Sequence, residues 1–240
     1  YDDFTPRVGL VYQPIPQISL FGSYSQSFSP NSDTDSSGDL LEPETSEGFE
    51  FGVKGEILEG KLLATLGYFN ITKKNVATTD PDDFFSSIAT GEQESQGVEF
   101  DLIGEIMPGW NIIASYAYID AEVTEDNNIP VGNRLFNTPE NSASLWTTYE
   151  IQQGSLQGFG FGGGFVFVGE REGDLENTFT ADSYFLTNAA LFYKRNDWRF
   201  ALNFKNLFDV NYISSTFGDR NARNEPGDPF EVIGSISVEF

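Results

Sequence analysis

The chain has 240 residues, a formal net charge of −24 and 23 phenylalanines. It contains no cysteine and no histidine, which excludes a disulfide scaffold, a thiolate metal site and the commonest general base. The negative charge argues against nucleic-acid binding, and no apolar run approaches the ~20 residues of a membrane helix. No nucleophile or acid–base pair stands out either, so we expect neither an enzyme nor a bound cofactor.

Almost the whole chain is predicted to form β-strands, because apolar and polar residues alternate with period two. Trp198, Phe200, Leu202 and Phe204, for example, alternate with polar or small neighbours. Eleven strands are expected, at 5–13, 17–28, 46–57, 61–72, 92–106, 109–121, 141–151, 157–169, 181–193, 197–208 and 229–240.

The segment 158–169 reads GFGFGGGFVFVG and shows the alternation in its strongest form. Successive side chains of a strand point to opposite faces, so one face is phenylalanine and the other is mostly glycine. A soluble β-sandwich could bury such a face in its core. We instead expect the phenylalanines to meet lipid, and the glycines to line an interior where small residues leave room for something packed inside.

The predicted connections alternate between short and long, which favours the lipid interpretation. Short turns are expected at 14–16, 58–60, 107–109, 152–155 and 195–197, and long loops at 29–45, 73–91, 122–140, 170–180 and 209–228. Long loops are uncommon in compact soluble domains. Short periplasmic turns that alternate with long extracellular loops are typical of outer-membrane β-barrels.

Aromatic residues gather at both ends of these strands, as the interfacial girdles of membrane barrels do. Beside the short turns lie Tyr12, Trp110, Tyr149, Phe159, Tyr193, Trp198 and Phe240. Beside the long loops lie Phe28, Tyr118, Phe167, Phe185 and Phe230. The two belts are about ten residues apart, the length of a membrane-crossing strand.

The predicted fold class is therefore an all-β transmembrane antiparallel β-barrel. Bacterial single-chain barrels have an even number of strands, so eleven strands are not expected to close by themselves. Eleven is half of the 22 strands of plugged outer-membrane transporters. We expect residues 1–240 to be the C-terminal half of such a barrel.

Several segments, in their order and spacing, resemble one family. They are PRVGLVYQP (6–14), SLFGSYSQSFSP (19–30), LLEPETSEGFEFGVK (40–54), LLATLGYFNITKKNV (62–76), ESQGVEFDLIG (94–104), NTPENSASLWTTYE (137–150) and the long run from 184 to 213 that contains NLFDVNYI. The chain is similar to the TonB-dependent outer-membrane receptors, in particular to their siderophore-receptor branch.

This resemblance implies a 22-stranded barrel filled by a plug domain, with import driven by TonB through a plug segment. The plug and the N-terminal strands are expected to be absent from 1–240. The implied partners are a ferric siderophore, outer-membrane lipid, lipopolysaccharide, and a barrel-assembly machinery that reads the strand ending at Phe240. Two positions depart from the family pattern: Asn188 stands where Asp is common, and Phe230 follows Pro229 where Arg is common.

The siderophore is expected to bind aromatic and charged groups at the bases of the long loops. The candidates are Arg134, Phe136, Arg171, Tyr184, Tyr212, Phe217, Arg220 and Arg223. An anionic ferric siderophore would favour arginine, and a neutral hydroxamate would favour tyrosine and phenylalanine. Haem, cobalamin or another metal complex, or a passive porin, are the alternatives, although the lack of histidine argues against haem.

More than half of the 37 carboxylates lie in the long loops. They could capture cations, or bind divalent ions that bridge to lipopolysaccharide; we favour a role in solubility. DTDSSGDLLEPE (33–44) superficially resembles a calcium loop, but the spacing after Gly38 is wrong and no helices are expected beside it. No metal site is therefore predicted.

Overall fold

The computed structural model describes residues 4–83, 85–218, 220 and 224–238. All eleven predicted strands are confirmed, and they form one antiparallel sheet. The strands are β1 (Arg7–Ile15), β2 (Ile18–Ser29), β3 (Glu44–Ile57), β4 (Leu62–Thr79), β5 (Ser87–Met107), β6 (Trp110–Glu125), β7 (Asn141–Glu150), β8 (Phe159–Val168), β11 (Tyr184–Arg195), β12 (Trp198–Lys205) and β15 (Glu231–Val238). Two small hairpins lie in the loops: β9 (Arg171–Glu172) with β10 (Thr180–Ala181), and β13 (Ile213–Ser215) with β14 (Glu225–Pro226). Within these residues, no helix is long and apolar enough to cross a bilayer.

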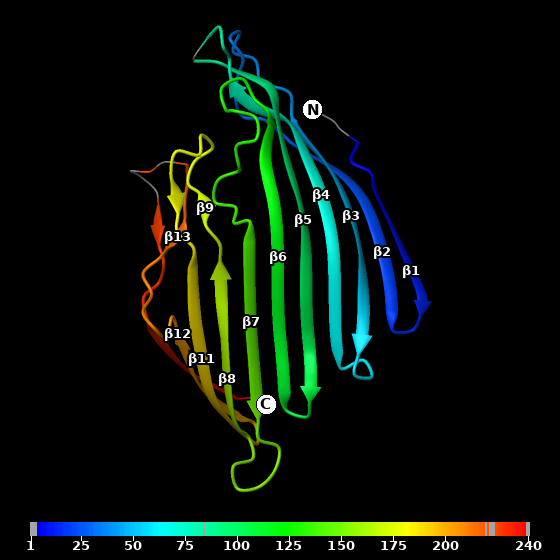
Figure 1. The fold of residues 1–240 in the computed structure, drawn as a ribbon, viewed down its shortest axis with the longest axis vertical. Coiled ribbons are helices and arrows are strands. Elements are labelled where there is room, and N and C mark those ends of the chain that lie inside the picture. The colour runs from blue at the N-terminus through cyan, green and yellow to red at the C-terminus, as the bar shows by residue number, and fades with distance from the viewer. Residues whose placement is uncertain (1–3, 84, 219, 221–223, 239–240) are drawn as a thin grey trace.

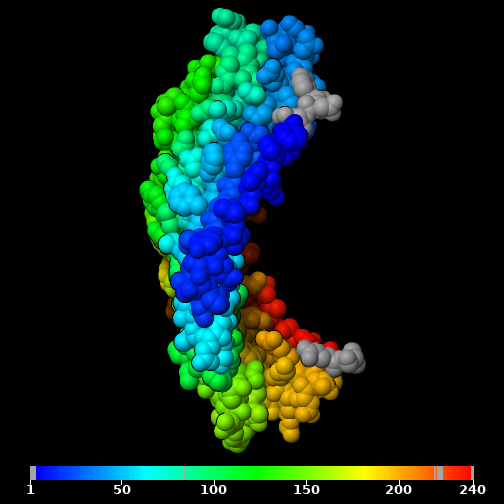
Figure 2. Space-filling view, turned by 90° about the vertical axis from the view of Figure 1, so that its right-hand side faces the viewer, coloured from blue at the N-terminus to red at the C-terminus, as the bar shows by residue number. Residues whose placement is uncertain are grey.

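The large sheet is a single curved layer (Figure 1), and from the side it bends into an arc with one hollow face (Figure 2). Each of its strands pairs with the next in chain order once the small hairpins are set aside, so β8 pairs with β11 and β12 with β15. No second sheet packs against it in the described chain, so the β-sandwich alternative is wrong. Since eleven strands alternate in direction, β1 and β15 at the two open edges run the same way.

The register gives this sheet one apolar and one polar face. Phe161 is paired with Tyr149 on β7 and with Leu191 on β11, and Leu191 is paired with Leu202 on β12. The four phenylalanines of β8 therefore share a face with the apolar positions of its neighbours, as predicted. Phe161 is 50% exposed, so this face is uncovered. Such an uncovered apolar band is the outer surface of a membrane barrel.

The glycine side of β8 is not the open space that we predicted. Aromatic rings from both neighbouring strands lie over it: Phe192 of β11 covers Gly160, and Trp146 of β7 covers Gly164. A Cβ atom added at Gly164 would lie 2.9 Å from Cε3 of Trp146. The glycines are thus small because the polar face already carries large rings beside them, and the prediction of free room at these positions is wrong.

The connections follow the predicted alternation, with two differences. The long loop predicted at 73–91 is mostly strand, because β4 continues to Thr79 and β5 begins at Ser87. The ladder persists through bulges after Lys74, although apolar alternation has ended there. The turn predicted at 152–155 is also longer, since β7 ends at Glu150 and β8 begins at Phe159.

Candidate functional site: the loop cluster and the polar wall

Three of the long connections contact one another and form what we call the loop cluster: residues 130–140, 170–183, 206–218, 220 and 224–230. The backbone N–H of Gly218 donates to the carbonyl of Gly173 at 3.1 Å, and that of Asn137 donates to Glu172 at 2.8 Å. β9 and β13 accordingly lie side by side above the upper ends of β8 and β11 (Figure 1). The topology thus brings most of the predicted ligand residues to one end of the sheet.

Arg171 lies at the centre of the loop cluster and is only 4% exposed. Its Nη1 donates to the carbonyl of Ser214 at 3.1 Å, and its Nη2 donates to that of Ile213 at 2.6 Å. The guanidinium also lies 5.5 Å from the ring centroid of Tyr184. Both terminal nitrogens therefore hold the last loop, and the ligand role of Arg171 stays a prediction.

Tyr184 and Tyr212 come together beside Arg171, with ring centroids 4.4 Å apart. The Tyr212 ring also packs over Gly227, where a Cβ atom would overlap it. Burial, and then the neighbouring Tyr184, raise the pKa of Tyr212 above its ordinary value. The Tyr212 phenol therefore keeps its proton at neutral pH.

Asparagines that the sequence analysis missed complete the loop cluster. Asn137 accepts from the backbone N–H of Thr216 and donates to Oγ of Ser215, both at 3.1 Å. Asn177 bonds in both directions with the backbone of Arg134, at 2.8 and 2.9 Å. Asn137 and Asn177 have φ values of 58° and 54°, which asparagine tolerates better than most residues. Asparagines within the predicted long loops could therefore have been recognised as candidates for such backbone positions.

Asn206 anchors the base of the last loop. It is 3% exposed, and its side chain bonds to the backbone of Val210 and to the carbonyl of Asp228 at 2.8–3.0 Å. Its backbone N–H donates to Oδ1 of Asn188 at 2.9 Å. Asn188, one of the two departures from the family pattern, thus supports the start of this loop. At the other departure, Phe230, the backbone N–H donates to Oδ1 of Asp209.

Other predicted ligand residues remain accessible at the surface of the loop cluster. Phe217 is 52% exposed, and the Arg220 guanidinium lies 6.0 Å from the ring centroid of Phe179. Arg134 is half-buried and forms an ion pair with Glu140 at 3.4 Å. Phe136 is also half-buried, and Arg223 lies outside the described residues. Phe217 and Arg220 are therefore the candidates best placed to meet a ligand from outside.

Many loop carboxylates are engaged in turns. Asp35 accepts from the backbone N–H groups of Ser37 and Asp39, at 2.9 and 3.0 Å. Asp83 accepts from Oγ of Ser86 at 2.7 Å and from the backbone of Phe85 at 3.2 Å, and these bonds lower the pKa of Asp83. The described part of the chain holds no group of three or more His, Cys, Asp or Glu side chains suited to a metal ion. Some of the acidic residues in the long loops therefore have a structural role, because their carboxylates accept the hydrogen bonds that form the turns.

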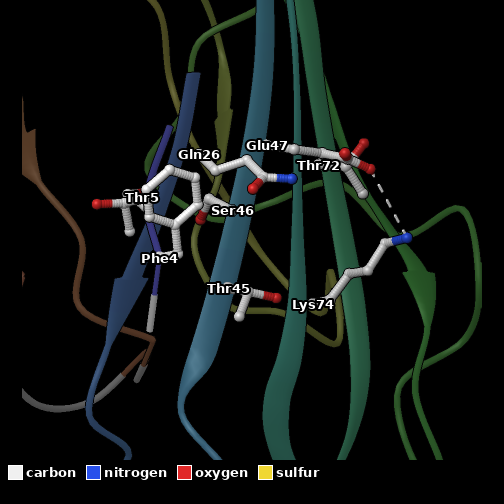
Figure 3. Close-up of a pocket in the computed structure, with 9 residues that line it drawn as sticks. Phe4, Thr5, Gln26, Thr45, Ser46, Glu47, Thr72 and Lys74 are labelled. Carbon is white, nitrogen blue, oxygen red and sulfur yellow. Dashed lines mark ion pairs between the residues drawn. The ribbon is translucent and has the colours of Figure 1, made fainter. Parts of the chain in front are cut away.

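A separate polar hollow of about 300 Å³ opens where β1 stops short of the upper end of β2 (Figure 3). Its lining includes Gln26, Glu47 and Lys74. Lys74 Nζ lies 3.8 Å from Glu47 and 3.7 Å from Glu92. Among the described residues that line this hollow, the single cation is thus already paired with two carboxylates, so the hollow offers little to an anionic ligand.

The polar face of β3–β5 carries a second hollow of about 300 Å³. Glu50 and Glu99 line it beside Gly67, and neither carboxylate has an ion-pair partner among the residues that the structure describes. Gly67 is paired with Glu99 on β5 and with Gly52 on β3. This part of the wall therefore suits a cationic or hydrogen-bond-donating partner on the polar face of the sheet.

Residues 1–207 match the family described as TonB dependent receptor-like, beta-barrel. The chain belongs to this family of receptors, as the resemblance implied. It is 38% identical over 238 residues to the metal-pseudopaline receptor of Pseudomonas aeruginosa, and the aligned region covers 98% of this chain and 33% of that protein. It is 33% identical over 219 residues to the ferrichrome outer membrane transporter/phage receptor of Escherichia coli, covering 89% and 29%.

Solved structures show the same architecture. The siderophore receptor PiuA of Acinetobacter baumannii superposes with a TM-score of 0.84 at 27% identity, over 97% of this chain and 35% of that one. The chain thus spans about a third of the length of the relatives that it matches.

Proposed function

We propose that this chain forms the C-terminal half of an outer-membrane receptor that takes up ferric siderophores. The observation that carries the proposal is the loop cluster: a rigid platform at the long-loop end of a membrane-type wall, with Phe217 and Arg220 at its surface. Loops on a rigid scaffold are where binding groups concentrate. The ferrichrome transporter and the siderophore receptor named above support the ligand class.

The two open edges of the sheet indicate how the barrel would close. Because β1 and β15 run in the same direction, antiparallel closure requires an odd number of further strands between them. Glu50 and Glu99 then face the lumen, where a plug domain with cationic or donor groups would pack. TonB would act on this plug, so energised uptake belongs to the whole receptor.

The remaining partners follow from the same placement. The apolar face meets outer-membrane lipid, and the long-loop end meets lipopolysaccharide. The C-terminal strand would be read by the barrel-assembly machinery through Phe240, a residue outside the described part of the chain. Deleting Phe240 should therefore reduce assembled receptor in cells more than it reduces the stability of refolded protein.

The test is siderophore uptake by the full-length receptor. The double variant Arg220→Ala, Arg223→Ala should weaken uptake of an anionic ferric siderophore by about tenfold, or ~1.4 kcal/mol, and affect a neutral hydroxamate much less. Arg195→Ala, in a short turn at the opposite end, is the matched control and should leave siderophore binding unchanged. Loss of siderophore binding in the control alone would invert the assignment of the two ends.

A second candidate is uptake of a complex of a metal other than iron. The 38% identity to the metal-pseudopaline receptor favours it. Competition between labelled iron–siderophore and a labelled divalent metal complex, each with the wild-type receptor, separates the two ligands. Uptake that persists after the proton gradient is dissipated would instead support a passive porin.

A further inference from the structure

The apolar face contains a groove of about 590 Å³ across β11, β12 and β15, near the short-turn end. Gly234 of β15 forms its floor, and Leu191, Leu202, Tyr193 and Phe200 form part of its walls. The groove exists because Gly234, the cross-strand partner of Leu202, has no side chain to cover the apolar face at that position. A Cβ atom at Gly234 would lie at ordinary contact distance, 3.6 Å, from Leu202 Cδ2.

Cations concentrate beside this groove. Lys194, Arg195 and Arg199 lie within six positions, in a chain with only 13 Lys and Arg residues and a net charge of −24. None of the three forms an ion pair with any residue that the structure describes, and Asp197 is the single carboxylate of the turn. Arg199 lies over Phe192 at 5.3 Å instead.

The register separates these three cations between the two faces. Lys194 and Arg199 are paired directly across strands on the polar face, whereas Arg195 is paired with Trp198 on the apolar face. Trp198 in turn stacks on Phe200, with centroids 6.1 Å apart. One row above Arg195 lie Tyr193 and Phe200, which line the groove. A cation thus lies at the end of an apolar groove and beside interfacial aromatic residues.

We propose that this groove binds a phospholipid of the periplasmic leaflet, with an acyl chain over Gly234 and the headgroup phosphate on Arg195. The proposal rests on the membrane placement given under the proposed function. Arginine forms bidentate bonds with phosphate, basic residues beside a membrane attract anionic headgroups, and Tyr and Trp prefer the headgroup level. Apolar surface, aromatic residues and charge therefore all match one amphipathic ligand.

A neighbouring hollow provides an internal control. It measures about 480 Å³ and lies on the same face, lined by Trp110, Tyr149, Phe161 and Gly163. No lysine or arginine occurs in the adjoining turns, 105–110 and 149–163. A Cβ atom at Gly163 would meet only Asn188 O, at 3.9 Å, so this hollow can be filled as readily as the groove. It shares the apolar character of the groove and lacks the cation.

The experiment measures phosphatidylglycerol retained by the detergent-purified full-length receptor, using native mass spectrometry across a range of lipid concentrations. Arg195→Gln should raise the half-saturating concentration about fivefold, which is ~1 kcal/mol for one basic residue at a lipid surface. Gly234→Leu places a side chain in the groove and should also raise it. Gly163→Leu should leave it within about twofold. Heat-dependent gel migration identifies correctly folded barrels before the comparison is made.

Equal effects of Gly163→Leu and Gly234→Leu would show that only non-specific surrounding lipid is bound, and would overturn the proposal. An unchanged Arg195→Gln variant would also overturn it. A receptor dimer that disappears in Gly234→Leu would identify a second copy of the receptor as the occupant instead. Lipid retention requires no siderophore, so a failed uptake assay leaves this result separately interpretable.

Discussion

The two halves of the long-loop end are built in different ways. Above β3–β6, the strands themselves continue: β4 has 18 residues and β5 has 21, joined by only residues 80–86. In the second half, the sheet strands β7, β8, β11, β12 and β15 have only 8 to 12 residues, and the loop cluster lies above them. The first half is held by a backbone ladder. The second is held largely by buried Arg and Asn side chains that bond to distant carbonyls and amides.

This difference determines what a single substitution does. In the β4–β5 hairpin, each residue contributes its backbone N–H and C=O groups to the pairing, so the loss of one side chain leaves the two strands paired. In the loop cluster, one side chain joins segments more than 40 residues apart, as Arg171 joins Ser214. We therefore expect the loop cluster to be sensitive to a few buried polar residues, and the hairpin to be tolerant.

The largest expected effect lies in the wall that supports both halves. Phe165 of β8 stacks on Phe185 at 4.9 Å, on the apolar face. Phe165→Arg should cost ~2–4 kcal/mol of folding free energy in a bilayer, because a charge in the middle of the lipid-facing surface must lose its hydration. Urea unfolding in liposomes measures the cost.

Asn203→Arg, on the polar face of β12, is the control for Phe165→Arg. Asn203 is paired with Ala190 and Ile233, so its side chain faces away from the lipid. Its cost in the same unfolding experiment should be small. If both arginines cost the same, the assignment of the two faces is incorrect.

The next effect tests the loop cluster itself. Arg171→Ala removes hydrogen bonding from a charged donor, an interaction worth ~1.5–3 kcal/mol, and should accelerate hydrogen exchange in 206–218 and 170–183. Arg171→Lys should accelerate exchange to an intermediate degree, because lysine keeps the charge but lacks the two parallel N–H donors of the guanidinium.

The matched change in the hairpin is Thr78→Val. Thr78 is 5% exposed, and its hydroxyl accepts from Asn127 at 2.8 Å. Because the β4–β5 ladder remains, amide exchange at the end of the hairpin should change little. Comparable loosening in both variants would remove the distinction between the two halves.

The smallest effect concerns the tip of the hairpin. The hydrogen bonds from Ser86 and Phe85 lower the pKa of Asp83, so the turn is supported by the ionised carboxylate. This support is complete above the ordinary carboxyl pKa and disappears as the pH falls through the lowered pKa. Asp83→Ala should abolish the pH dependence of the Phe85 and Ser86 amide signals in NMR. A transition that survives in Asp83→Ala would assign it to another group.

The sequence predicted the wall and missed the organisation of the loops, for a physical reason. Alternation reports which face each residue takes, and Trp198 to Phe204 or Trp110 to Tyr118 were placed correctly by it. It is silent where both faces are polar, so the extension of β4 to Thr79 was assigned to a loop. It also cannot show that the rings of Trp146 and Phe192 fill the space beside the glycines of β8.

The sequence predicted which residues could form the candidate site but not how they are arranged. Arg171, Tyr184 and Tyr212 were chosen because they are cationic or aromatic, and the fold does bring these three together. Whether an arginine meets solvent or a buried carbonyl depends on the path of a loop 40 residues away, which no local pattern encodes. The asparagines at 137, 177 and 206 were missed because their role is conformational and their partners are distant.

The acceptors in the loop cluster are mostly main-chain carbonyls. Arg171 binds those of Ile213 and Ser214, and Asn206 binds those of Val210 and Asp228. A carbonyl is present whatever side chain its residue carries. Mutation can therefore vary the outward side chains of the last loop while a few buried donors preserve its shape, so that the surface of this loop can evolve without a change in the structure beneath it.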